Sequence, residues 1–133
     1  MNPESLRYAK THEWVHVGEN AAGEKIATLG VSQFAVEALT DLVFIDLPQV
    51  GRQVSAGQSL CEIESVKAVS DIYSPVNGEV IEVNTDLPDH LEILSDDPYE
   101  KGWIARIRLA DDGGLGQLMD YAVYQAQCEQ EDH

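Results

Sequence analysis

Hydrophobic and polar residues alternate over much of this chain, which is the pattern of half-buried β-strands. Short β-favouring runs are separated by turn-forming segments rich in Gly, Asn or Pro, and they lie at residues 11–17, 25–30, 42–47 and 79–83. Residues 103–109 alternate most cleanly, with two arginines on one face and four apolar residues on the other: Trp103, Ala105, Ile107 and Leu109. The pattern predicts a mainly β domain.

A longer β-favouring run extends from residue 59 to residue 73. Strands in globular domains usually have about 3 to 10 residues, so this run must fold back on itself. No Gly, Pro or Asn marks the bend, and we place it in the middle of the run, at residues 65–68. The bend puts Lys67 at the exposed tip of a hairpin.

Helical spacing is confined to short segments. Ser32 has the character of an N-cap for a helix of about two turns over residues 33–39. Residues 86–100 form an acidic loop, in which we expect a helical turn at residues 97–99. A C-terminal amphipathic helix is expected to pack on the sheets through residues at helical spacing: Leu115, Leu118, Met119, Ala122, Val123 and Ala126.

The chain has 133 residues and is 44% hydrophobic, which suits one domain with its own core. We expect an ordered core over about residues 6–127 and fraying at residues 129–133. The net charge of -16 opposes binding to nucleic acid or to an anionic membrane. No window approaches the roughly 20 apolar residues of a membrane span. We therefore expect a cytoplasmic location, or the mitochondrial matrix if a transit segment was removed before Met1.

Motifs of enzymes and metal sites are absent from the sequence. There is no P-loop, no Gly-x-Ser-x-Gly elbow and no Cys-x-x-Cys, so we do not expect an enzyme. His12 and His16 stand four residues apart, but on a strand their Cα atoms would lie about 13 Å from each other. We therefore expect no metal site.

Lys67 is the one basic residue between Arg52 and Lys101, an interval that contains eleven acidic residues. Its sequence neighbours favour the ammonium form, which disfavours a role as a Schiff-base nucleophile. Two interpretations remain: a solvated surface lysine, or a lysine that another enzyme acylates.

Several segments, in order, resemble the lipoyl carrier family of the glycine cleavage system, the H proteins. The resemblance extends from about Leu6 to the C-terminal helix. The segments are His12-Glu13-Trp14-Val15, Leu29-Gly30-Val31-Ser32, Asp41-Leu42-Val43-Phe44-Ile45-Asp46-Leu47-Pro48, Glu64-Ser65-Val66-Lys67-Ala68-Val69-Ser70-Asp71, Tyr73-Ser74-Pro75-Val76-Asn77-Gly78-Glu79-Val80, and Asp97-Pro98-Tyr99 with Gly102-Trp103. The segment around Lys67 differs from the Asp-Lys-Ala of 2-oxoacid dehydrogenase lipoyl domains and from the Met-Lys-Met of biotinyl domains.

The resemblance implies the lipoyl fold, a barrel-sandwich hybrid of two antiparallel sheets with added helices. It implies that Lys67 bears lipoate in amide linkage. A lipoate-attaching enzyme would recognise the residues on either side of it, which are Glu64, Ser65, Val66 and Ala68.

Three further partners are implied by the resemblance. A pyridoxal phosphate-dependent glycine decarboxylase loads the aminomethyl group of glycine on the lipoyl arm. A folate-dependent aminomethyltransferase then releases ammonia and takes the one-carbon unit, and a flavin-containing dihydrolipoamide dehydrogenase reoxidises the arm. The chain would be a monomeric carrier and not a catalyst.

Glu13 and Asp71 are candidates for a groove that receives the loaded arm, because their carboxylates could hold the aminomethyl cation. Ordinary surface solvation of both acids is the alternative. Thr40, Val69 and Ser95 depart from residues that are usual in the family. A lipoyl carrier that serves another pathway or relays lipoate therefore stays open as a second hypothesis, and an unmodified interaction protein as a third.

Overall fold

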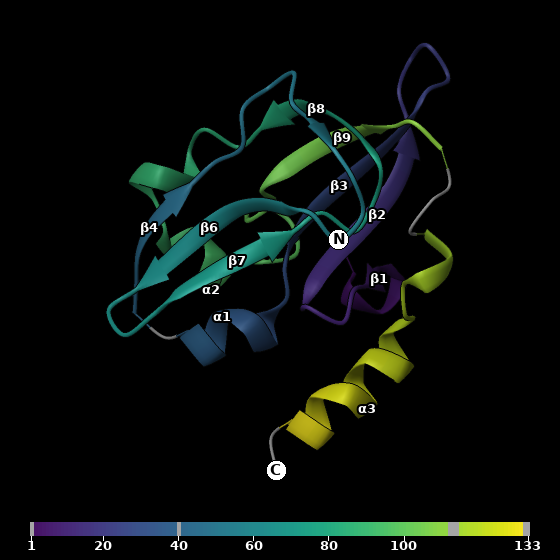
Figure 1. Cartoon of the computed structure of the whole chain (residues 1–133). Helices are drawn as coiled ribbons and strands as arrows, with labels where there is room; N and C mark the ends of the chain where they lie inside the picture. Colours follow the sequence, from purple (N-terminus) through teal and green to yellow (C-terminus); the bar gives the residue numbers. More distant parts are fainter. Residues whose placement is uncertain (1, 40, 112–114, 132–133) are drawn as a thin grey trace.

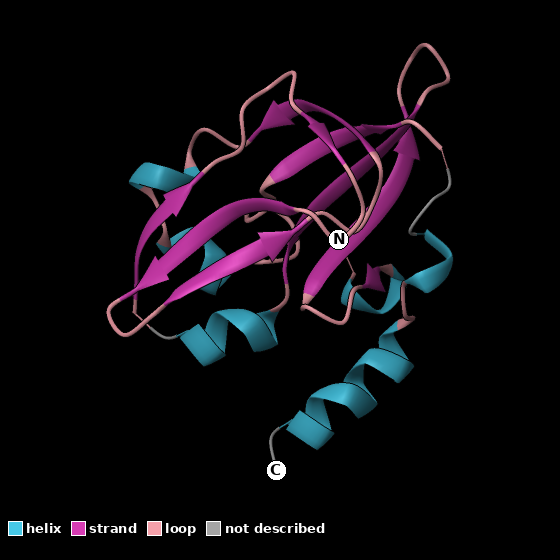
Figure 2. Cartoon of the chain, in the orientation of Figure 1, coloured by secondary structure: helices cyan, strands magenta, loops and turns pink. Residues whose placement is uncertain are grey.

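The computed structural model describes residues 2–39, 41–111 and 115–131. Two antiparallel sheets face each other, and short helices lie around them (Figures 1 and 2). The expected mainly β fold of two antiparallel sheets with a C-terminal helix is confirmed. Within the described part of the chain, no helix is both long and apolar enough to cross a membrane.

The larger sheet has six strands in the order β1-β2-β3-β9-β8-β5. Their bounds are Arg7–Tyr8 for β1, Glu13–Glu19 for β2, Lys25–Val31 for β3, Ala105–Leu109 for β9, Gly78–Val83 for β8 and Gln53–Val54 for β5. The hairpin expected from residues 11–17 and 25–30 is β2 with β3, which pairs Glu13 with Val31 and Trp14 with Gly30. The two-residue edge strands β1 and β5 were not predicted, because two residues carry no periodic signal.

The smaller sheet has three strands in the order β4-β6-β7. Their bounds are Leu42–Asp46 for β4, Ser59–Ser65 for β6 and Val69–Tyr73 for β7. The run from residue 59 to residue 73 is therefore a hairpin that turns at residues 66–68, as predicted. Its tip is the far left end of the molecule in Figure 1.

The main hydrophobic core lies between the two sheets. Ile45, Ile63 and Ile72 of the smaller sheet are almost fully buried, as are Leu29 and Ile107 of the larger one. A second, mostly aromatic cluster lies under the C-terminal helix and consists of Leu6, Tyr8, Trp14, Tyr124 and Cys128.

The helices are short. They are α1 at Gln33–Leu39, α2 at Glu92–Asp96 and α3 at Tyr121–Glu131, with 3-10 turns η1 at Pro3–Ser5, η2 at Leu87–Asp89 and η3 at Leu115–Gln117. Ser32 caps α1 as expected, since its Oγ accepts a hydrogen bond from the Ala35 N–H at 3.3 Å. At residues 97–99, where a helical turn is expected, the chain forms a single hydrogen-bonded turn and no separate helix. The Glu100 N–H donates to the Asp97 carbonyl at 3.4 Å, and Asp97 is the C-cap of α2.

Leu115, Leu118 and Met119 pack against the core clusters as expected, but they precede α3, and the face that α3 itself buries differs from the prediction. Tyr124 and Cys128 are buried, whereas Val123 is 53% exposed and Ala122 and Ala126 are exposed as well. The Tyr124 ring stacks on Tyr8 with centroids 4.4 Å apart. An aromatic ring buries more area than Ala or Val, and its hydroxyl finds partners here, so it determines which side of the helix packs.

Two smaller expectations concern the position of Trp103 and the C-terminal end of the last helix. Trp103 precedes β9 and packs against the second cluster, with the Arg106 guanidinium 4.3 Å above its ring, whereas Ala105 and Ile107 lie in the main core. Trp103 therefore does not share their face. α3 continues to Glu131, and residues 132 and 133 lie outside the described residues.

Candidate functional site

Lys67 stands at the apex of the β6–β7 hairpin, where its side chain is exposed. The turn is closed by Ser65, whose N–H donates to the Ala68 carbonyl at 2.8 Å. The Ser65 hydroxyl adds two bonds, accepting from the Ala68 N–H at 3.1 Å and donating to the Ala68 carbonyl at 3.2 Å. The side chain of Ser65 therefore takes the place of the Gly or Asn that such a turn usually contains.

The tip is also tied to the rest of the smaller sheet. The Val66 N–H donates to the carbonyl of Asp41, just before β4, at 3.0 Å. This bond fixes the backbone on one side of Lys67 while its side chain stays in solvent. The amine of Lys67 is thus exposed on a backbone whose neighbouring residues are held by hydrogen bonds.

The surface around Lys67 combines apolar and acidic side chains. Val66 is 70% exposed, Val69 60%, Val43 53% and Phe44 48%, which are high values for apolar residues. Three carboxylates lie side by side across the outer face of the smaller sheet, because Glu62 of β6 pairs with Asp46 of β4 and with Asp71 of β7. An apolar tip beside an acidic face is suited to a partner with an apolar pocket and basic residues around it.

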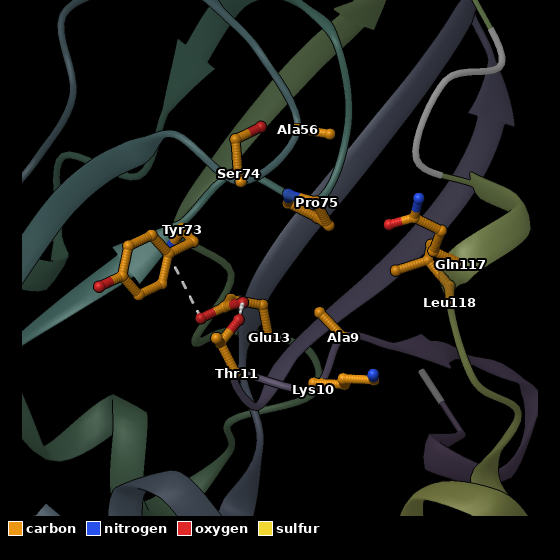
Figure 3. Close-up of a pocket in the computed structure, with 11 residues that line it drawn as sticks. Ala9, Lys10, Thr11, Glu13, Ala56, Tyr73, Ser74, Pro75, Gln117 and Leu118 are labelled. Carbon is orange, nitrogen blue, oxygen red and sulfur yellow. Dashed lines mark hydrogen bonds between the residues drawn. The ribbon is translucent and has the colours of Figure 1, made fainter.

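Glu13 lies at the other end of β7, in the wall of a cavity of about 680 Å³ (Figure 3). Residues from four separate parts of the chain line this cavity: Ala9, Lys10, Thr11, Glu13, Ala56, Gly57, Tyr73, Ser74, Pro75, Gln117 and Leu118. Such a wall exists only in the folded protein. Thr11 and Tyr73 are functional candidates that the sequence did not indicate.

The carboxyl group of Glu13 is held by two donors. The Thr11 hydroxyl donates to Oε1, and the Tyr73 N–H donates to Oε2 at 3.4 Å. Only 1% of Glu13 is exposed, and this burial raises the pKa of its carboxyl group to about 7, although both hydrogen bonds lower it. A buried carboxyl group poised near neutrality, beside a cavity, can hold a proton or bind a cation.

Asp71 is not brought together with Glu13. It is exposed on β7, accepts a hydrogen bond from the Ser59 hydroxyl at 3.2 Å, and does not line the cavity. Val69, Asp71 and Tyr73 nonetheless share one face of β7, because side chains alternate along a strand. This face spans about 13 Å from Val69, beside the hairpin tip, to Tyr73 at the cavity, and Asp71 lies midway along it.

The described residues contain no set of side chains arranged as metal ligands. Across residues 2–39, 41–111 and 115–131, no group of three or more His, Cys, Asp or Glu side chains is placed to hold a metal ion. His12 packs on Phe34 of α1, whereas His16 is exposed on β2.

A family model described as "Glycine cleavage H-protein" matches residues 6–131 of this chain. The chain belongs to this family. The H protein of Rhodopirellula baltica is 55% identical over 97% of this chain and 96% of its own length, and that of Thermotoga maritima is 42% identical over 94% and 97%. A crystal structure of the H protein from Mycobacterium marinum superposes with a TM-score of 0.84 at 38% identity, covering 95% of this chain and 98% of that one.

The residues expected to depart from the family's usual pattern are Thr40, Val69 and Ser95, and the positions of the latter two are compatible with the family's fold. Val69 is exposed beside the tip, and Ser95 is exposed on α2. Thr40 lies outside the described residues. Neither described residue contributes to a core cluster, so both departures alter the surface and leave the packing of the fold intact.

Proposed function

We propose that this chain is the lipoyl carrier of a glycine cleavage system and that lipoate is attached to Lys67. The observation that carries the proposal is the exposed apex position of Lys67 within a chain that matches the H-protein family over residues 6–131. Amide linkage needs an accessible amine on a backbone that an attaching enzyme can grip, and Ser65 and Val66 hold that backbone.

When attached, lipoate supplies a strained disulfide ring that accepts the aminomethyl group of glycine and becomes reduced as it does so. The chain contributes the tether and the docking surfaces and does not catalyse the steps. A flexible tether at an exposed tip raises the local concentration of its end group at each partner's active site. The partners in this proposal are glycine decarboxylase, the aminomethyltransferase, dihydrolipoamide dehydrogenase and a lipoate-attaching enzyme.

The cavity beside Glu13 is the proposed resting place of the loaded arm. An aminomethyl group is cationic at neutral pH, and a cation next to Glu13 favours the ionised form of the carboxyl group. Thr11 and the Tyr73 N–H hold that ionised form, because both donate to carboxylate oxygens. Asp71 lies on the strand face between Lys67 and the cavity, where it would attract the cation on its way.

The acidic outer face of the smaller sheet would steer the carrier toward basic surfaces on its partners. Exposed charges are screened over about 8 Å at physiological salt, so this steering weakens as salt rises. Val66 and Val69 at the tip supply apolar contact once a partner has docked.

Intact-mass measurement after incubation with a lipoate-attaching enzyme tests the attachment site. Wild type should gain one lipoyl increment, and Lys67→Arg should gain none. Lys101→Arg, which keeps the charge at another exposed lysine, is the matched control and should behave as wild type. An increment that persists in Lys67→Arg would refute the assignment of this residue.

Reconstitution tests the pathway separately. The lipoylated carrier is mixed with glycine, glycine decarboxylase and pyridoxal phosphate, and glycine-dependent loading is followed by mass. We expect loading, followed by ammonia release when the aminomethyltransferase and folate are added. Full lipoylation without glycine-dependent loading would instead indicate a carrier that serves another lipoate pathway.

The arm-docking proposal is tested on the loaded carrier with Glu13→Gln. We expect faster non-enzymatic release of ammonia from this variant, because the amide cannot pair with the cation. An unchanged release rate would contradict docking at Glu13 and would leave the lipoyl attachment untouched.

A further inference from the structure

One face of α3 contacts the loop between β1 and β2, the loop that leads into Glu13. The Tyr124 hydroxyl lies 2.7 Å from His12 Nδ1, and a Glu131 carboxylate oxygen lies 3.1 Å from His12 Nε2. Gln127 Nε2 donates to the Lys10 carbonyl at 2.9 Å. Residues 124, 127 and 131 lie on one side of a helix, so this face as a whole holds the loop.

His12 has a backbone conformation that needs such support. Its φ is 76°, and among the described residues it is the one non-glycine residue with a positive φ. The left-handed region costs an L-residue about 1–2 kcal/mol. The neighbouring structure offsets this: the His12 ring stacks on Phe34 with centroids 4.8 Å apart, and its carbonyl accepts from the Ser32 N–H at 2.9 Å.

A consistent set of protons satisfies every partner of His12. In the tautomer that carries its hydrogen on Nε2, His12 donates to Glu131 and accepts at Nδ1 from the Tyr124 hydroxyl. The Tyr124 oxygen in turn accepts from the Ser32 hydroxyl at 2.5 Å. Burial raises the pKa of Tyr124, so its hydroxyl keeps the proton that it donates. The chain of bonds therefore links α3, the His12 loop and the N-cap of α1.

The other side of the same loop forms the cavity. Lys10, Thr11 and Glu13 line it, and Thr11 donates to the Glu13 carboxyl group. The loop is closed by the Ala9 N–H, which donates to the Glu13 carbonyl at 2.9 Å. A rotation of the backbone at His12 would thus move its two neighbours, Thr11 and Glu13, relative to each other.

We propose that α3 clamps the β1–β2 loop through His12, and that His12 is a positioning residue which keeps Thr11 and Glu13 aligned in the wall of the cavity. His12 acts through its neighbours and does not face the cavity itself, because it is not among the lining residues. The relevance of this clamp to the lipoyl arm rests on the proposed function. The clamp itself requires no lipoate.

The test uses Tyr124→Phe in the unmodified, full-length protein. This variant removes the hydroxyl that contacts His12 and Ser32 and keeps the ring that stacks on Tyr8. We expect the amide hydrogens of the loop, such as the Ala9 N–H, to exchange about fivefold faster, the factor that corresponds to loss of the one Tyr124 hydrogen bond that reaches the loop, the bond to His12. Val123→Ala is the matched control, since Val123 is next to Tyr124 on α3 but its own side chain is 53% exposed.

A second measurement separates positioning from general stability. Titration of the Glu13 carboxyl carbon by NMR reports whether that group is still buried and aligned. We expect the pKa of Glu13 in Tyr124→Phe to fall from about 7 toward its ordinary value as water reaches the cavity wall, and to stay unchanged in Val123→Ala. His12→Gly, which accepts a positive φ without strain, should shift it in the same direction.

An unchanged Glu13 titration and unchanged loop exchange in Tyr124→Phe, with α3 still helical by NMR, would overturn the clamp. If α3 unfolds in that variant, His12→Gly decides the question, because it leaves every residue of the helix in place. Neither measurement uses lipoate or the partner enzymes. The clamp can therefore fail while the carrier function stands, and the reverse is also true.

Discussion

The substitution Glu13→Gln isolates the titration of the buried carboxyl group, because the amide preserves its size and both of its contacts. The Gln carbonyl oxygen can accept from the Tyr73 N–H, as Glu13 Oε2 does at 3.4 Å. The Gln amide can donate to the Thr11 oxygen, because a hydroxyl is both donor and acceptor. What the variant loses is the group that titrates.

The size and the sign of the effect follow from the pKa of Glu13. The folded protein raises it from 4.5 to about 7, so the folded state binds this proton more tightly than the unfolded state. The stabilising effect is fully present below about pH 4.5 and is lost as pH rises through about 7. The shift corresponds to about 3 kcal/mol of pH-dependent unfolding free energy in wild type. Glu13→Gln lacks this contribution, because its amide does not titrate.

Urea unfolding from about pH 4.5 to about pH 8, in about 0.15 M salt to screen the other carboxylates, measures the difference between wild type and Glu13→Gln. We expect the free energy of unfolding of the variant to rise by about 3 kcal/mol relative to wild type across this range. Glu62→Gln, on the exposed outer face of the smaller sheet, is the control and should run parallel to wild type. If Glu13→Gln also ran parallel to wild type, the inferred burial of a titrating carboxyl group would be wrong.

Two further predictions concern the tip and the aromatic cluster. Ser65→Ala removes the hydroxyl bonds to Ala68, and we expect a loss of about 1 kcal/mol in urea unfolding together with slower lipoylation; a normal lipoylation rate would show that this hydroxyl does not shape the tip. Gly30→Ala would bring a Cβ within 2.7 Å of the Trp14 indole, so we expect about 1–3 kcal/mol of destabilisation, whereas Gly116→Ala, with open space around it, should be nearly neutral. Equal stabilities of the two alanine variants would contradict the packing of Trp14 on Gly30.

The hairpin tip could be located from the sequence because the length of a strand is limited. A β-favouring run of residues 59–73 exceeds one strand, and its middle had to bend. The sequence did not show what closes the bend, since no turn residue is present. The structure supplies the answer in Ser65, whose hydroxyl makes bonds that a backbone turn would otherwise make.

The cavity and the packed face of α3 could not be predicted, for a shared physical reason. Both depend on contacts between residues distant in the chain, such as Glu13 with Tyr73 in the cavity and Tyr8 with Tyr124 under the helix. Helical spacing of Ala and Val indicated a face that is in fact exposed. Periodicity reports where apolar residues recur, but the burial of a large aromatic ring outweighs a stripe of small side chains.

Three of the segments that resemble the family, at residues 12–15, 29–32 and 97–99, meet at one junction of the fold, away from the hairpin tip. Trp14 lies opposite Gly30, its indole N–H donates to the Pro98 carbonyl at 2.8 Å, and the Ser32 N–H donates to the His12 carbonyl. These contacts support the cavity wall, whereas the tip depends on its own turn and on the bond from Val66 to residue 41.

Effects on distant sites with no shared partner usually add. Glu13→Gln should therefore leave lipoylation intact, and Ser65→Ala should leave the Glu13 titration intact. A double variant whose stability departs from the sum of the two single effects by more than about 0.5 kcal/mol would show that tip and cavity are coupled. Independence would mean that an attaching enzyme can bind the tip of this chain without disturbing the cavity that we propose as the resting place of the arm.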